Sequence, residues 1–280
     1  MTALARSPFA VCARQELLLS VRSKWTQAFA VVFALLALAV AGSGYVLSGG
    51  AGVQDFARTA ASLVQLVLLL VPLTSLVLGV LALSPERGAA EILFSQPVAR
   101  RTIWLGKLAG LFGGLAAAQA IGLGAAGLVI FWRSGREGLG GYALLFLASL
   151  ALTAVFLSIA GLLAAGGTGR RAKTLALALV VWFAGVILFD VVALGIASLL
   201  PSGTASRTLV IAVLVNPADA IRTGALLGIS GTTAFGPASA ALLRFTHGPP
   251  GAAILIAAST LLWIAVPAAV GVRRMTRADI

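Results

Sequence analysis

The chain has 280 residues, of which 60% are hydrophobic and only 10% are charged. A soluble domain carries about 25% charged residues, so this composition excludes an ordinary soluble enzyme and indicates an integral membrane protein. The net charge of +12 is not a nucleic-acid signal, because the basic residues form short clusters at the ends of apolar segments, as in membrane proteins.

The first 24 residues predict a helix on the inner membrane surface, ahead of the first span. Ser7 and Pro8 match an N-cap followed by proline at the first helical position. One broad helical face then carries Ala10, Val11, Leu17, Leu18 and Val21, while Glu16 and Ser20 lie off that face. We expect an amphipathic elbow helix within 1–24. The alternative is a plain juxtamembrane tail.

Six apolar segments are long enough to cross a bilayer core, which takes about 20 residues per helix. They lie near 25–47, 60–83, 106–132, 141–165, 174–199 and 252–272. The predicted fold is an all-α membrane protein with a six-span domain over 25–280. Leu209–Val215 is too short to span and is expected in an extramembrane loop. In the third span Gly106, Gly110 and Gly114 allow close helix packing, either within the chain or across a dimer.

The lysines and arginines predict the orientation of these spans. If the spans alternate in direction, 14 of the 20 basic residues lie on the side that holds both termini. This excess favours cytoplasmic termini in a bacterial inner membrane. The segment 84–107 is then cytoplasmic, and 200–251 forms the one large external segment.

The external segment predicts a small folded lobe rather than a disordered loop, which is the alternative. Asn216 and Pro217 match an N-cap and a first helical residue, and Asp219 falls in the first turn, so a helix should run to about Leu227. A second short helix is expected over 237–245. Arg222 lies in the first of these helices and completes a candidate surface for an external partner.

Candidate chemistry is sparse. One cysteine (Cys12) and one histidine (His247) predict no disulfide framework, no metal site and no catalytic cluster. Asp190 is the one charged residue deep in a predicted span. It is interpreted as a structural partner in the bundle or as part of a pathway or mechanical contact. An intramembrane enzyme is disfavoured, since no second acid or histidine lies within the predicted spans to form a dyad or a relay with Asp190.

The segment Gly167–Thr174 is close to a phosphate-binding loop, but Ala172 stands where that motif requires glycine. It also joins two predicted spans and does not join a strand to a helix. We therefore expect no cofactor on this chain. ATP and magnesium would be bound by a separate protein.

The most distinctive segment is the cytoplasmic loop Ser84–Lys107. Ser84 and Pro85 can begin a helix with Glu86 in its first turn, and Pro97 ends it. Between them lies an apolar patch, which in water requires a partner. The patch consists of Ile92, Leu93 and Phe94. Its alternative partner is the bilayer surface.

In order, the loop carries an acid–arginine pair, a glycine, an apolar doublet, Ser-x-Pro and basic residues before Gly-Lys. This order resembles the coupling-helix segment of permeases of type 2 ABC exporters, although Ala89-Ala90 replaces a Gly-Thr pair common there. The resemblance implies contact with an ATPase through Glu86, Arg87, Gly88, Glu91, Leu93, Phe94 and Pro97. It also implies that Arg100, Arg101 and Lys107 anchor the membrane face.

A narrower resemblance rests on Val181–Phe183, Leu188–Asp190 and Val215–Asp219 with Arg222. These segments resemble NosY-like permeases of nitrous-oxide-reductase maturation systems. The resemblance implies a homodimer paired with an ATPase homodimer and a periplasmic accessory protein. The implied cargo is a sulfur or copper-related species. The alternatives are an exporter of lipid, polysaccharide or drug, and a mechanical transmitter that moves no solute.

Overall fold

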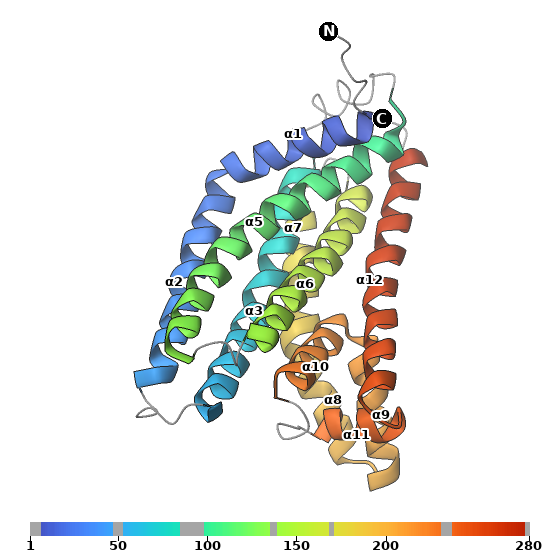
Figure 1. Ribbon diagram of the computed structural model, residues 1–280. Helices are drawn as coiled ribbons and strands as arrows, with labels where there is room; N and C mark the ends of the chain where they lie inside the picture. The colour runs from blue at the N-terminus through green and yellow to red at the C-terminus, as the bar shows by residue number, and fades with distance from the viewer. Residues whose placement is uncertain are drawn as a thin grey trace.

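The structure is a computed structural model, and it describes residues 7–46, 53–84, 98–134, 139–167, 171–230 and 237–277. Helices account for nearly all of this part of the chain, and no strand occurs in it. The predicted all-α class is confirmed. Figure 1 shows a bundle of long helices with α1 (Pro8–Arg22) lying across one end of it.

Six helices are long and apolar enough to cross a membrane, and they coincide with the six predicted segments. The fifth is one run in which a π-helical segment, η1, joins two α-helices. The six are α2 (Lys24–Val46), α3 (Val53–Leu83), α5 (Arg100–Ser134), α6 (Leu139–Gly166), α7–η1–α8 (Arg171–Trp182, Phe183–Leu188, Phe189–Ser198) and α12 (Pro249–Arg277). The start of α1 and the end of α12 lie at the same end of the bundle (Figure 1).

Helix α1 occupies the range in which a surface helix was predicted. The Ala10 amide donates to the Ser7 side chain at 3.3 Å, and Pro8 is the first helical residue. Glu16 and Ser20, predicted to lie off the apolar face, are buried against α5, whereas Val11, Leu18, Leu19 and Val21 are exposed. The side of α1 that carries Glu16 and Ser20 therefore faces the protein, whereas the exposed side carries these apolar residues together with Arg14 and Gln15.

The glycine row of α5 packs against α1. A Cβ atom on Gly106 would lie 2.7 Å from the Cβ of Cys12, and one on Gly110 would lie 2.6 Å from the Cβ of Glu16. Such distances cannot be met without movement of one helix. Of the two predicted uses of the row, the structure shows packing within the chain, and its partner is the elbow helix and not another span.

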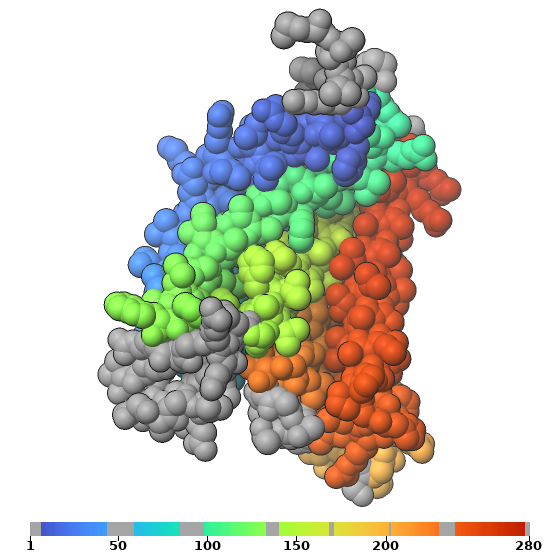
Figure 2. Space-filling view, in the orientation of Figure 1, coloured from blue at the N-terminus to red at the C-terminus, as the bar shows by residue number. Residues whose placement is uncertain are grey.

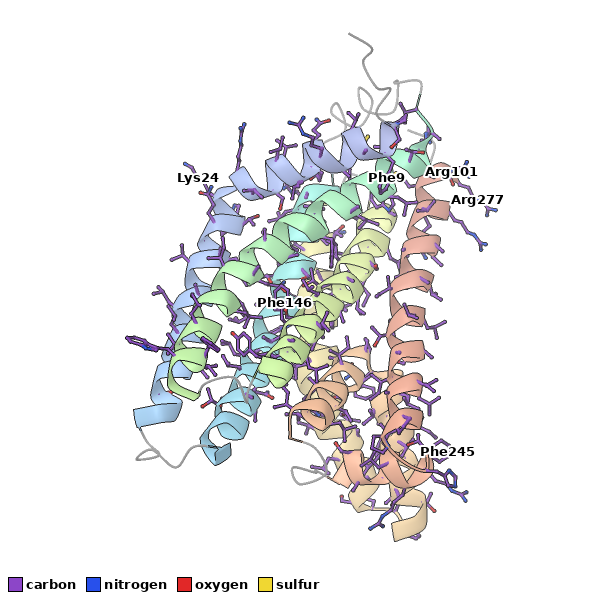
Figure 3. All side chains as sticks on the ribbon, in the orientation of Figure 1. Phe9, Lys24, Arg101, Phe146, Phe245 and Arg277 are labelled. Atoms are coloured by element: carbon purple, nitrogen blue, oxygen red, sulfur yellow. The ribbon has the colours of Figure 1, made fainter. Side chains whose placement is uncertain are left out.

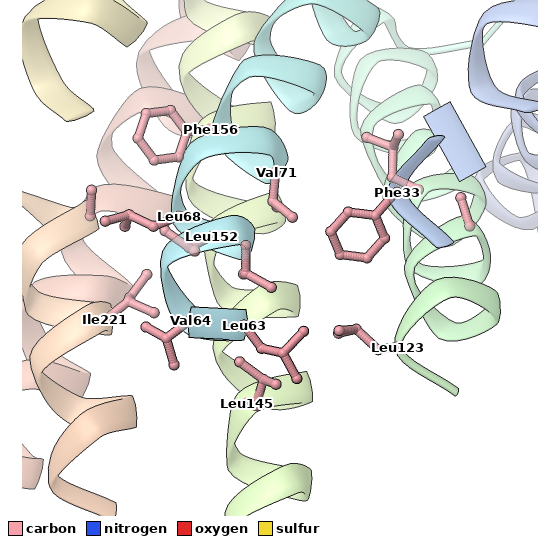
Figure 4. Close-up of a cluster of buried hydrophobic side chains, with 14 of the residues drawn as sticks. Phe33, Leu63, Val64, Leu68, Val71, Leu123, Leu145, Leu152, Phe156 and Ile221 are labelled. Atoms are coloured by element: carbon pink, nitrogen blue, oxygen red, sulfur yellow. The ribbon is translucent and has the colours of Figure 1, made fainter. Parts of the chain in front are cut away.

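The main core lies between α2, α3, α5 and α6 (Figure 4). Phe33 of α2, Leu63 of α3, Leu123 of α5 and Leu145 of α6 are fully buried there. Buried polar side chains add direct ties between spans: Gln119 Nε2 donates to Thr153 Oγ1 at 2.6 Å, joining α5 to α6. Because lipid is as apolar as leucine, close packing and such hydrogen bonds hold these helices together.

The fifth and sixth spans lie at the periphery of the bundle. Only 6% of the apolar window of α7–α8, and of that of α12, is buried, against 56% for α6. Figure 2 shows α12 as a column along one edge of the molecule. Most of the surface of these two spans is available to lipid or to another protein.

Three helices follow the fifth span at the far end of the bundle: α9 (Ser202–Val215), α10 (Pro217–Ser230) and α11 (Pro237–Phe245). They pack around a small core of their own, together with the start of α12. Leu209–Val215, predicted to lie in a loop, is instead the second half of α9. With α10 it forms a pair bent by 102°, which would count as a seventh crossing only if taken as one broken span.

Candidate functional site: a polar cluster between the fifth span and α10

The centre of the cluster is Asn216, at the bend between α9 and α10. Its backbone is extended (φ −92°, ψ 113°), as expected for a residue that precedes proline. Its side-chain oxygen accepts from the Ala218 amide at 3.1 Å, which is the predicted N-cap of α10. Its Nδ2 donates to the Gly185 carbonyl at 2.7 Å and to Asp219 Oδ2 at 3.2 Å. Asn216 thus joins three helical segments.

Arg222 lies between two carboxylates. Its Nη1 is 2.6 Å from Asp190 Oδ2 on α8, and its Nη2 is 2.8 Å from Asp219 Oδ1 on α10. The Asp219 side chain is only 6% exposed, whereas Asp190 is 34% exposed. The arginine therefore compensates a buried charge on its own helix and at the same time connects α10 to the fifth span.

The fifth span changes its helical form just before Asp190. Residues Phe183–Leu188 form a π-helix, in which each carbonyl pairs with the amide five residues on. Such segments amount to an inserted residue and occur often at functional sites. The Gly185 carbonyl, which accepts a hydrogen bond from Asn216, lies inside this segment. The cluster therefore contacts the fifth span where its helical form is least regular.

Helix α12 fixes the other side of the bend. Ser259 Oγ donates to the Leu214 carbonyl at 2.6 Å, and Trp263 Nε1 donates to the Val215 carbonyl at 3.0 Å. These carbonyls are at the end of α9, where a helix lacks donors of its own. The bend at Asn216 is therefore held by both the fifth and the sixth span.

The cluster is suited to mechanical connection more than to chemistry. Both carboxylates are paired with the same arginine, and the described residues contain no group of three or more His, Cys, Asp or Glu side chains that could hold a metal. Arg222 brings Asp219, an acid outside the six spans, into the same cluster as Asp190, and the sequence did not indicate this association. The predicted residues Asn216, Pro217, Asp219 and Arg222 do lie together, but on the bundle-facing side of α10.

A second set of polar contacts lies at the opposite end of the molecule, where α3 ends. Lys107 Nζ is 3.3 Å from Glu16 Oε2 on α1 and 3.4 Å from the Ala82 carbonyl. Arg171 Nη2 donates to the Leu81 carbonyl at 2.9 Å. Cations at a helix C-terminus compensate its dipole. Lys107, predicted to be a membrane-face anchor, therefore ties α1, α3 and α5 together.

These contacts hold the end of α3, which is followed directly by Ser84, the first residue of the predicted coupling loop. The predicted ATPase contacts all lie outside the described residues; they are Glu86, Arg87, Gly88, Glu91, Leu93, Phe94 and Pro97. The loop ends at the start of α5, where Arg101 is exposed and lies at the same end of the bundle as Phe9 and Arg277 (Figure 3). The basic residues predicted at the membrane face thus gather at one end.

The comparisons agree with a six-span membrane subunit of this design. A family model described as "ABC-2 family transporter protein" matches residues 10–280. The chain belongs to this family and is therefore an ABC transporter permease subunit. It is 33% identical over 274 residues to the "Probable ABC transporter permease protein NosY" of Stutzerimonas stutzeri, covering 93% of this chain and 92% of that protein. A protein of the same name from Pseudomonas aeruginosa is 33% identical over 225 residues, or 78% and 80% of the two chains.

Proposed function

We propose that this permease serves the maturation of nitrous oxide reductase, driven by a separate ATPase. The observation that carries the proposal is the similarity to NosY permeases over nearly the whole chain. Two copies would pair with two ATPase subunits, which bind ATP and magnesium. The chain itself would bind no cofactor and catalyse no reaction.

The ATPase would act on the loop Ser84–Lys107. Its apolar patch would enter a cleft on the ATPase, and Glu86 and Arg87 would make polar contacts beside it. The contacts of Lys107 and Arg171 support this role, because they hold the end of α3 from which the loop begins. A force on the loop would therefore reach α1, α5 and α7 directly.

The orientation follows from charge. The basic clusters, the start of α1 and the end of α12 gather at one end of the bundle, and we assign that end to the cytoplasm. Helices α9–α11 would then face the periplasm and dock an accessory protein. Exposed Arg207, Arg244 and Phe245 provide cationic and aromatic contacts for it.

Among the possible functions of the permease, the geometry favours mechanical coupling to that accessory protein. Two buried polar residues of the spans, Gln119 and Thr153, form a helix contact inside the bundle. The polar cluster connects the fifth span to α9–α11, so movement of that span would reach the outer face. A sulfur or copper-related species could still be the final cargo, passed on by the accessory protein.

One observation favours a second candidate function. The exposed surface of α7–α8 is apolar and includes Val180, Phe183, Val191 and Leu194. Two copies facing each other across such surfaces would suit an apolar cargo, as in an exporter of lipids. Nucleotide-dependent movement of a fluorescent lipid in vesicles would support this alternative, and its absence would favour mechanical coupling.

The test is co-purification of this chain with a co-expressed candidate ATPase subunit. The double variant Glu86→Ala/Arg87→Ala should lose ATPase association and, in cells, the accumulation of active nitrous oxide reductase. Arg207→Ala, an exposed cation of α9, is the control and should retain ATPase association. If the double variant keeps both association and reductase maturation, the coupling role is wrong.

A further inference from the structure

We propose that the fifth span works as two rigid segments joined by a hinge, that the hinge is the π-helical segment Phe183–Leu188, and that Asn216 positions it. The inference rests on the proposed function for its role in coupling, but its geometry does not depend on the ATPase. The inner segment is α7, fixed to α3. The outer segment is α8, fixed to α10.

Helix α7 is fixed to α3 at both of its ends. Arg171, its first residue, donates to the Leu81 carbonyl at 2.9 Å, and Trp182, its last, donates through Nε1 to the Leu69 carbonyl at 3.1 Å. The two donors are 11 residues apart and the two carbonyls 12, so each spacing spans roughly 17 Å. Helices α3 and α7 therefore run antiparallel in register, as one rigid pair.

The contact of Trp182 with α3 lies beside an interruption in the helical hydrogen bonding of α3. Pro72 lies inside α3 and has no amide hydrogen, so the helical hydrogen bond to the Leu68 carbonyl is lost. The neighbouring Leu69 carbonyl accepts the Trp182 indole N–H. The tryptophan lies immediately before the π-helical segment, so the rigid pair ends where that segment begins.

Beyond the π-helical segment the partners of the fifth span change. Asp190, near the start of α8, pairs with Arg222 of α10, and α8 also packs on α9. Arg222 is held in turn by Asp219 on its own helix. Helix α8 is therefore attached to α9 and α10, whereas α7 is attached directly to α3. Because α10 in turn packs on α3 and α6, a movement of α8 relative to α3 would have to occur at its contact with α10.

The segment between the two attachments has the properties of a hinge. A π-helix carries one extra residue, so converting it to a regular α-helix would turn the following helix by about 100°. A Cβ atom on Gly185 would meet nothing within 4 Å, so the segment is open on that side. Asn216 supplies a contact to the Gly185 carbonyl at 2.7 Å, and we assign it the role of holding the π-helical form.

The test measures distances within one protomer by pulsed electron paramagnetic resonance. Cys12→Ala removes the one native cysteine, and spin labels at exposed positions form two pairs: Gln65 with Val180, and Gln65 with Leu194. The first pair joins α3 to α7, and the second joins α3 to α8. Labelled chain is diluted with unlabelled chain in lipid nanodiscs, without ATPase, so that only pairs within one protomer contribute.

Asn216→Ala should broaden or shift the distance from Gln65 to Leu194 and leave the distance from Gln65 to Val180 unchanged. Asn216→Ser is the companion variant, since it keeps an oxygen that can cap α10 but lacks the amide group that donates to the Gly185 carbonyl. Thr208→Val, which removes a hydrogen bond within α9, is the matched control and should change neither distance. If both distances broaden together, or neither changes in both Asn216 variants, the hinge is wrong.

A second arm adds the ATPase and compares the nucleotide-free and ATP-bound states. We expect the distance to Leu194 to shift and the distance to Val180 to remain constant. Equal shifts in both would overturn the hinge even if the ATPase binds normally. Failure of the ATPase to bind would overturn the proposed function, while the nucleotide-free distances would still decide the hinge.

Discussion

Arg222 makes the connection between the fifth span and α10, and the sequence did not indicate its partner. Asp190 was recognisable because an acid inside a span is unusual, and Asn216 with Pro217 was recognisable as a helix start. Their association was not, since Asp190 and Arg222 are 32 residues apart and no local pattern reports such a contact. Physically, each acid near a membrane requires a cation, and only the fold decides which one.

We predict a definite order for the loss of protein stability when each of the three charged residues of the cluster is substituted. Arg222→Gln should cost the most, about 3–5 kcal/mol, because it leaves two carboxylates without a cation. Asp219→Asn should cost less, and Asp190→Asn should cost about 1 kcal/mol or less, since Asp190 is 34% exposed. Thermal unfolding of the purified chain in detergent checks the order. A larger loss for Asp190→Asn than for Arg222→Gln would contradict it.

The ion pair of Lys107 and Glu16 provides a second prediction about single residues. The Glu16 side chain is only 8% exposed, so Lys107→Met should leave a buried carboxylate uncompensated and lower the unfolding temperature. Adding Glu16→Gln to Lys107→Met should restore much of that loss, because the charge is then removed. If the double variant is less stable than Lys107→Met alone, the two side chains do not compensate each other.

Among the helices, α1 was predicted in its range, but its packing partner was not. Its capping residues and amphipathic pattern could be predicted from the sequence, because N-caps and 3.6-residue periodicity are local signals. Its contact with Gly106, Gly110 and Gly114 was not, since a row of small residues shows that a helix approaches closely but not which helix. The same limit applies to the π-helical segment, which leaves no trace in hydropathy.

Two glycines of α5, one inside the row that packs on α1 and one outside it, provide a matched pair of substitutions. Gly110→Ala should displace α1 from α5, because the new Cβ atom would meet the backbone of α1 and the Cβ of Glu16. Gly124→Ala, farther along α5, should be tolerated, since a Cβ atom there would meet nothing within 4 Å. Limited proteolysis after Arg14 and Arg22 should be faster in Gly110→Ala alone. Equal rates in both variants would contradict the contact.

Over the whole molecule, hydropathy predicted the six spans because twenty apolar residues in a row have few other uses. It did not predict that the fifth and sixth spans lie at the periphery of the bundle, because mean hydropathy does not report burial: the fifth span, at 2.6, is more apolar than the largely buried fourth span, at 2.4. The arrangement places the end of α3, which precedes the predicted coupling loop, at one end of the molecule and helices α9–α11 at the other. The fifth span contacts the end of α3 through Arg171 and α10 through Asp190.

This arrangement predicts opposite accessibility for two exposed arginines. In a Cys12→Ala background, Arg277→Cys should react with an impermeant maleimide only from the cytoplasmic side of membrane vesicles. Arg207→Cys on α9 should react only from the opposite side. Reaction of both residues from the same side would contradict the proposed orientation, and the reverse pattern would invert it.

The central claim is that a separate ATPase drives this permease through the loop Ser84–Lys107. The most direct test replaces Phe94 with photoreactive benzoylphenylalanine in native membranes and looks for a crosslink to the ATPase. The matched control carries the same group in place of Trp132, which is 90% exposed near the other end of α5. We predict a crosslink to the ATPase from position 94 and none from position 132. No crosslink from position 94, or equal crosslinking from both positions, would contradict the claim.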